Sequence, residues 1–168
     1  PRALEAIAHA DLIVLGPGSL YTSLLPNLLV PELVEAIGRS HAPRLYICNL
    51  MTQPGETDGL DVSGHLRAIE SQLASIGVEQ RLFDSVLAQD ALPDGPELDY
   101  YRSKGAEPVD CDLDGLRDQG YRVMLASMQG PQQRSQGRDF KGTLRHDSRS
   151  LALAVMRFYR AKAKRQSD

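Results

Sequence analysis

Short apolar runs alternate along the chain with longer stretches whose apolar residues recur every three or four positions. The runs cover residues 11–15, 44–50, 83–89 and 121–127, and compact apolar runs of this length are typical of buried strands. Residues 62–76 predict an amphipathic helix, with Gly77 at its C-terminal end. The apolar face of this helix consists of Val62, Leu66, Ile69, Leu73 and Ile76.

Other helices are predicted from weaker signals. Residues 1–8 have a helical pattern, and the stretch after the first strand predicts two helical pieces, 20–25 and 31–39, because Pro26 and Pro31 interrupt it. A last helix is predicted to begin near Asp147 or Ser148, either of which suits the N-cap. Residues 105–121 predict a short strand and a short helix. Residues 129–142, which are rich in Gln, Gly and Arg, predict a mobile surface loop.

This alternation of strands and helices predicts a single α/β domain over residues 1–168, with a mostly parallel sheet. In sheets of this kind, ligands bind beyond the carboxyl ends of the strands. Two polar loops follow strands here, at residues 16–19 and 51–59. We therefore expect the two loops to border one cleft.

The first loop reads Gly-Pro-Gly-Ser, from Gly16 to Ser19, and leads directly into a helical segment. The free amides of a helix start carry partial positive charge, and glycine lets an anion approach the backbone. Thr22 and Ser23 add hydroxyl donors. An anion site is therefore one interpretation. The other is a tight corner in which Ser19 is a plain N-cap, since no lysine follows and neither a P-loop nor a dinucleotide fingerprint is present.

The second loop gathers side chains that can donate and accept hydrogen bonds. Asn49, Thr52 and Gln53 suit a nucleotide base or sugar hydroxyls. Glu56 is the one candidate for a general acid or base. The alternative is a hydrophilic surface loop in which Glu56 anchors nearby amides.

Two of the four histidines have surroundings that suggest a role or a position. His65 lies between the apolar positions of the 62–76 helix, so we expect it to be partly exposed. His146 stands in a polar cluster between Arg145 and Asp147. This cluster could meet an anion, or it could simply begin the last helix.

Net charge and cysteine content argue against some classes of protein and favour others. A net charge of −3 and a pI of about 5.8 give no global basic field, which argues against a nucleic-acid binder. Two distant cysteines, Cys48 and Cys111, predict free thiols and a cytoplasmic protein. No CxxC metal motif is present, and no apolar run approaches the length of a membrane span.

Basic residues gather at the end of the chain, in residues 157–168. Cations are favoured near the C-terminus of a helix, so this tail predicts a solvated helix end. A further hypothesis is an interaction module whose strand-end loops contact a protein partner, and the basic tail is its only other support.

Two long motifs carry a resemblance to a known family. AHADLIVLGPGSLYTSLLPNLLVPELVEAI and LYICNLMTQPGETDG resemble the YvcK-like proteins, also called gluconeogenesis factors. GAEPV at 105–109 and RHD at 145–147 are similar to the C-terminal part of that family. These proteins are related to the CofD enzymes, which transfer a phospholactyl group to a deazaflavin. The resemblance implies a Rossmann-like three-layer sandwich.

The resemblance also implies a function. YvcK-like proteins are thought to bind UDP-sugars such as UDP-N-acetylglucosamine, and they are linked to gluconeogenic growth, cell shape and wall synthesis. We therefore expect a regulatory protein in the cytoplasm, with a homodimer or cell-wall regulatory proteins as partners. The residues expected to hold the ligand come from both loops: Gly16, Pro17, Gly18, Ser19, Leu20, Tyr21, Thr22, Asn49, Met51, Thr52, Gln53, Gly55, Glu56 and Thr57.

The chain also departs from the family pattern. The family begins with a GGGTG-type nucleotide loop and later has an Asp-Asp-Gly-Gly-Ser segment, and neither is present here. The chain therefore resembles the C-terminal half of such a protein, which leaves part of the nucleotide site outside it. CofD enzymes have GPSNP where this chain has GPGSL. This makes a transferase, which would use Mg²⁺, the alternative to a regulator without turnover.

Overall fold

The computed structural model describes residues 2–91, 96–129 and 144–166. Strands and helices alternate along these residues, as the apolar pattern predicted. None of the helices in the described part of the chain is long and apolar enough to span a bilayer. In chain order the elements are α1 (Arg2–Ala8), β1 (Ile13–Leu15), η1 (Leu20–Leu24), α2 (Leu25–Leu28), α3 (Pro31–Arg39), β2 (Arg44–Ile47), α4 (Val62–Ser75), β3 (Ser85–Gln89), α5 (Pro96–Ser103), α6 (Leu113–Asp118), β4 (Arg122–Ala126) and α7 (Ser148–Gln166).

The four strands form one parallel sheet in the order β1-β2-β3-β4. Each strand therefore pairs with the strand that follows it in the chain, and the helices make the crossovers between them. The carboxyl ends of all four strands lie along the same edge of the sheet. Both polar loops begin at that edge.

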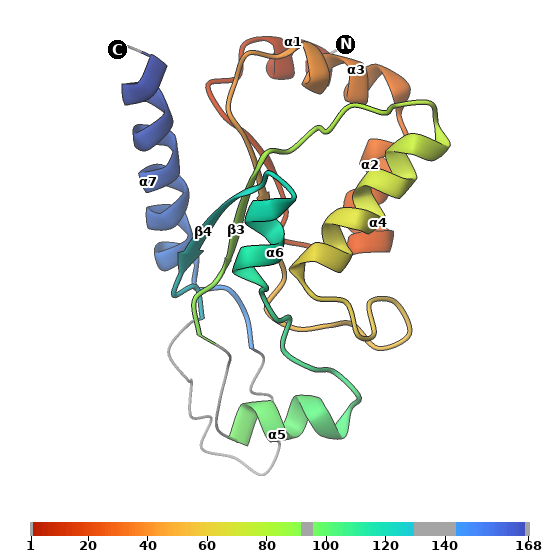
Figure 1. The fold of residues 1–168 in the computed structure, drawn as a ribbon, viewed down its shortest axis with the longest axis vertical. Helices are drawn as coiled ribbons and strands as arrows, with labels where there is room; N and C mark the ends of the chain where they lie inside the picture. The colour runs from red at the N-terminus through yellow and green to blue at the C-terminus, as the bar shows by residue number, and fades with distance from the viewer. Residues whose placement is uncertain (1, 92–95, 130–143, 167–168) are drawn as a thin grey trace.

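Helices cover both faces of the sheet, which confirms the three-layer arrangement (Figure 1). Side chains alternate between the faces along each strand. Tyr46 and Val86 lie in the core shared with α2, α3, α4 and α6. Leu45 and Leu87 lie in the core on the other face, together with Leu98 of α5 and the inner side of α7. Because both faces are covered, the central strands are apolar in their middle parts, at 45–47 and 86–88.

Several predicted element bounds need correction. The strand predicted over 44–50 ends at Ile47, because the chain then turns away and the backbone of Leu50 pairs instead with Val109. Pro26 does not break the helical segment. It lies in the first turn of α2, where its missing N–H costs no hydrogen bond. The helix α5 was not predicted at all.

Other predictions are confirmed. Pro31 is at the first position of α3, and α4 ends just before Gly77, whose φ of +81° marks its left-handed stop. Asp147 caps α7, since its Oδ1 accepts from the Ser150 amide at 2.7 Å. This bond holds the pKa of the Asp147 carboxyl below its usual value. The predicted mobile loop at 129–142 lies outside the described residues except for Gln129.

Candidate functional site

The first loop crosses the end of β2 at very close range. Gly16 has a φ of +92°, and a Cβ at this position would lie 2.7 Å from the Ile47 carbonyl oxygen. Only glycine fits such an approach without displacing the backbone of β2. The absence of a side chain at Gly16 therefore allows the end of β1 to lie against the end of β2.

The second loop is joined to the first by a pair of hydrogen bonds. The side-chain oxygen of Asn49 accepts from the Gly18 amide at 3.2 Å, and its Nδ2 donates to the Gly18 carbonyl at 2.9 Å. An amide side chain can make both bonds because it carries one acceptor and one donor group. Asn49 lies two residues after the end of β2, so this pair fixes the position of Gly-Pro-Gly-Ser relative to the sheet. It also occupies the Gly18 amide, which we had expected to be free for an anion.

Ser19 and Glu56 make a second connection between the loops. The Ser19 hydroxyl donates to Glu56 Oε2 at 2.8 Å, and the Thr22 hydroxyl donates to Ser19 Oγ at 2.6 Å. The Gln53 side-chain amide donates to Glu56 Oε1 at 2.6 Å. Both oxygens of Glu56 therefore have partners. Ser19 is at the N-cap position of η1, as one interpretation expected, but its side chain makes no capping bond to that helix and contacts Glu56 instead.

Two threonines hold the second loop in shape. Thr57 is buried, and its hydroxyl accepts from the Gln53 amide at 2.7 Å. Thr52 is also buried and pairs with Glu107 through both its backbone and its hydroxyl, at 2.7 and 2.9 Å. Gly55 lies in the turn, where its amide donates to Asp58 Oδ2 at 2.7 Å. The loop is thus an ordered unit whose hydroxyls are used within the chain.

The remaining predicted site residues divide by exposure. Leu20 and Met51 point into the two cores, so only their backbone atoms can face a ligand. Tyr21 is 45 % exposed, and Pro17 is exposed as well. The accessible part of the site therefore consists of Pro17, Tyr21, Thr22, Gln53 and Gly55, beside the half-buried Ser19 and Glu56.

His146 lies at the same edge of the sheet, although it was not among the predicted site residues. Its Nε2 donates to the Cys48 carbonyl at 3.3 Å, so the ring is beside the residue that precedes Asn49. Partial burial lowers the pKa of this imidazole. The polar Arg-His-Asp cluster was the signal in the sequence. Its closeness to the loops could not be predicted, because it depends on how α7 docks.

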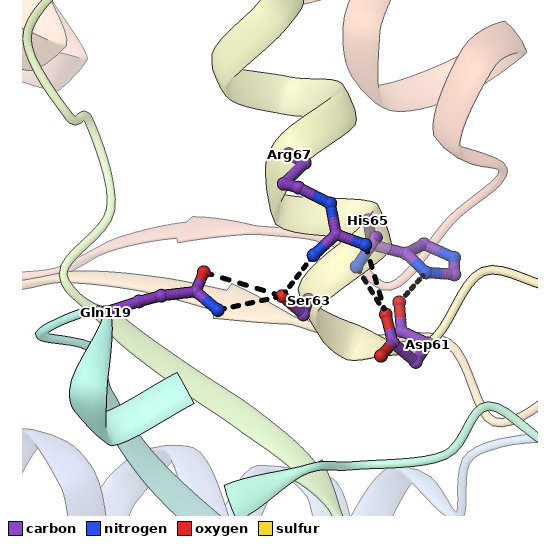
Figure 2. A network of polar contacts seen from close by, with 6 residues as sticks. Asp61, Ser63, His65, Arg67 and Gln119 are labelled. Atoms are coloured by element: carbon purple, nitrogen blue, oxygen red, sulfur yellow. Dashed lines mark hydrogen bonds and ion pairs between the residues drawn. The ribbon is translucent and has the colours of Figure 1, made fainter. Parts of the chain in front are cut away.

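His65 is fully buried, so the prediction of partial exposure is wrong. Its Nδ1 donates to the Asp61 carbonyl at 2.9 Å. Figure 2 shows the His65 ring pointing away from Ser63 and Gln119, which bond each other across α4 and α6. Residues at the start of α4 are buried all round because α6 and the adjoining loop cover that turn.

Metal-ligand clusters and pockets do not add to this site. Among residues 2–91, 96–129 and 144–166, no three His, Cys, Asp or Glu side chains gather as a metal site would require. A depression of about 510 Å³ lies at the end of α4 and the segment that leads to β3, bordered by Glu70, Glu79 and Arg81 among others. It is near the amino end of β3, away from the two loops.

Comparison with known proteins identifies the family to which this chain is similar. The family described as "2-phospho-L-lactate transferase CofD" matches residues 1–129. The gluconeogenesis factor of Bacillus subtilis is 37% identical over 157 residues, which is 93% of this chain and 45% of that protein. The gluconeogenesis factor of Halalkalibacterium halodurans is 49% identical over 119 residues, which is 71% of this chain and 35% of that protein.

A known crystal structure is similar to this chain in both fold and sequence. A member of the UPF0052 family from Bacillus halodurans has a TM-score of 0.79 and 38% identity, covering 92% of this chain and 46% of that one. The chain thus spans about a third to about a half of the length of the curated relatives it matches. The two motifs, the parallel three-layer fold and these matches agree, and the chain belongs to the CofD family, among relatives named gluconeogenesis factors.

Proposed function

We propose that this chain contributes the two-loop wall of a nucleotide-sugar site in a regulatory protein, with UDP-N-acetylglucosamine as the representative ligand. The observation that carries the proposal is the docking of the two loops beyond the carboxyl ends of β1 and β2, through Asn49–Gly18 and Ser19–Glu56. Ligands in open α/β sheets bind at this edge. A pre-ordered loop pair lowers the entropic cost of binding.

The chemistry of this wall suits a phosphorylated sugar. The first amides of η1 lack acceptors within their own helix, and the Ser19 and Thr22 hydroxyls lie beside them. Arg145 and His146 would provide cationic or donor groups from the start of α7. Exposed Tyr21 and Gln53 would contact the base or the sugar.

Glu56 takes a positioning role in this proposal. Because Ser19 and Gln53 already donate to its two oxygens, the carboxylate connects the loops. Each oxygen keeps a further lone pair, so the positioning role rests on the two contacts that Glu56 makes and not on a lack of accepting capacity. The proposed protein is therefore a sensor of the ligand, linked to gluconeogenic growth, cell shape and wall synthesis, and needs no turnover.

Calorimetry of the full-length protein with UDP-N-acetylglucosamine tests the proposal. We expect binding, and we expect Ser19→Ala to weaken it by about tenfold or more, because a hydrogen bond to a charged group contributes about 1.5–3 kcal/mol. Ser75→Ala, at the exposed end of α4, is the matched control and should bind like the wild type. The absence of both heat and a thermal shift with the wild type would refute the proposal.

The second candidate function is a CofD-type transfer of a phospholactyl group to a deazaflavin acceptor. It is favoured by the match of residues 1–129 to the family described by that activity. The test is product formation with Mg²⁺ by the full-length protein, beside a CofD enzyme as positive control. Product from the positive control and none from this protein would exclude the transferase and leave the regulatory proposal standing.

A further inference from the structure

The last helix carries an unusual set of charges. Six of the 19 basic residues of the chain lie in α7, whereas none of its 22 acidic residues does. The helix dipole favours cations only near the C-terminal end. Arg149 is in the first turn and Arg157 is in the middle of the helix, so the dipole does not account for them.

The inner side of α7 is already packed. Ala154 and Phe158 are buried in the core on this face of the sheet, and Leu151 and Val155 pack beside them. Lys162 lies close to this side and pairs with Asp84 at 3.6 Å. Figure 1 shows α7 along one margin of the molecule beside β4, which leaves its opposite side uncovered by the elements drawn there.

The opposite side has its own regular pattern, which we call the outer stripe. Its residues are Arg149, Leu153, Met156, Arg160 and Lys164, and all are exposed. At 100° per residue these five positions fall within an arc of about 80°. At 1.5 Å per residue the stripe is about 22 Å long. Leu153 and Met156, at 53% and 44% exposure, form its apolar centre.

The cations of this side are largely unpaired. Arg157 is exposed at the margin of the outer stripe, about 20° beyond Lys164 at 100° per residue. In the part of the chain that the structure describes, the ion pairs include neither Arg157 nor Arg160 nor Lys164. Arg149 interacts electrostatically with Asp147 at the N-cap. An apolar centre with cations at both ends is the arrangement of a protein interface, in which Arg and Met are enriched and the rim is polar.

The spacing of the stripe indicates the shape of its partner. Steps of four, three and four residues from Arg149 to Arg160 match the seam along which a second helix packs. A membrane surface would need a broad apolar face, and the broad apolar face of α7 is already packed on the sheet. A nucleic acid would place phosphates against the apolar centre, where Leu153 and Met156 cannot pair with them.

We propose that the outer stripe of α7 is a docking surface for an acidic amphipathic helix of a partner protein. Leucine-like side chains of that helix cover Leu153 and Met156. Its carboxylates pair with Arg157, Arg160 and Lys164, and arginine can do so with two parallel hydrogen bonds. The surface is on the face of the sheet opposite α4, and the proposal does not rest on the proposed ligand.

Two synthetic helical peptides of the length of α7 test this surface with the full chain. One has leucines on the 3–4 spacing flanked by glutamates, and the other has lysines in place of the glutamates. We expect the wild type to bind the acidic peptide, and higher salt to weaken this binding. Arg157→Glu with Arg160→Glu should weaken it by about tenfold or more and should favour the lysine peptide.

Arg2→Glu with Lys104→Glu is the matched control, because it reverses two exposed charges on α1 and beyond α5. It should retain the wild-type preference. Leu153→Ala with Met156→Ala should also weaken the acidic peptide without changing the melting temperature, since both side chains are exposed. Equal binding of both peptides, no binding of the acidic peptide, or equal losses in the control variant would each overturn the proposal. So would charge-dependent binding to anionic vesicles or DNA in place of the peptide.

Discussion

At the scale of single residues, His65 is the most unusual group in the core. Its Nδ1 donates to the Asp61 carbonyl, so in the neutral ring Nε2 carries a lone pair. Nε2 is buried and has no hydrogen-bond partner among the described residues. Burial lowers the pKa of this imidazole, because a charge would lose its hydration.

This burial predicts a dependence of stability on pH. A group whose pKa is lower in the folded state destabilises the fold once the pH drops below its unfolded pKa of about 6.5. We therefore expect the free energy of unfolding to fall between about pH 7.5 and about pH 5.5. His65→Asn, whose Nδ2 can replace the Nδ1 donor, should lose less stability over the same range. The measurement is urea unfolding of both proteins at each pH.

His146 also has a lowered pKa and contributes with the same sign. Comparing wild type with His65→Asn isolates the contribution of His65, since His146 is present in both. Equal losses in the two proteins would show that His65 is not responsible.

The limits of residue-level prediction follow from packing. The loops were identified because polar residues followed apolar strands. The structure joins the loops through Asn49 with Gly18 and Ser19 with Glu56, and Gln53 bonds Glu56 within the second loop. The orientation of these side chains could not be predicted, because it depends on the register between β1 and β2. His65 was misplaced because the periodic pattern showed one apolar face, while α6 covers a further side of α4.

At the scale of elements, the turn after β1 depends on a single glycine. Gly16→Ala would place a methyl group 2.7 Å from the Ile47 carbonyl oxygen, at a φ of +92°. We expect it to destabilise the protein by about 2 kcal/mol or more, from backbone strain and overpacking together. Chemical denaturation measures this loss.

Gly59→Ala is the matched control for this substitution. Gly59 has a φ of +69°, but no atom lies within 4 Å of the position of its Cβ. It should cost only the left-handed strain of about 1 kcal/mol. If both variants lost the same stability, the close approach of β1 to β2 would not be the reason for glycine at position 16.

Helices were predicted correctly where the apolar spacing is long or the capping residues are clear. The 14-residue helix α4 was predicted from its apolar spacing, and the final helix from its capping residues. Helix α5 was missed because it is short, begins with proline and buries only part of its surface. Residues 20–24 were predicted only as helical. In the structure they form a wider π-helical turn, in which the Leu24 amide donates to the Ser19 carbonyl.

At the scale of the whole molecule, the described strands form a sheet with β2 and β3 at its centre and β1 and β4 on its outer sides. Leu45, Ile47, Val86 and Leu87 in the central strands have almost no exposed surface, whereas β1 is an edge strand of three residues. Amides deep in the sheet open only with global unfolding, and edge amides open locally. We expect amides of β2 and β3 to exchange much more slowly than those of β1. Hydrogen exchange followed by mass spectrometry or NMR measures the difference.

The outcome of this experiment also reports on the state of the chain in solution. If β1 amides exchanged as slowly as those of β2, a further strand would have to cover the β1 edge. Comparison at two protein concentrations separates pairing between chains from pairing within one chain.

The neighbour-by-neighbour order of the sheet has a consequence for synthesis. Each strand pairs with the strand made just before it, so no strand has to insert between two strands already paired. The sheet can therefore grow from β1 to β4 in the direction in which the ribosome releases the chain. Helix α7 is made after all four strands and packs on the face that holds Leu45 and Leu87. Until α7 arrives, the part of that face that Ala154 and Phe158 cover is open to chaperones.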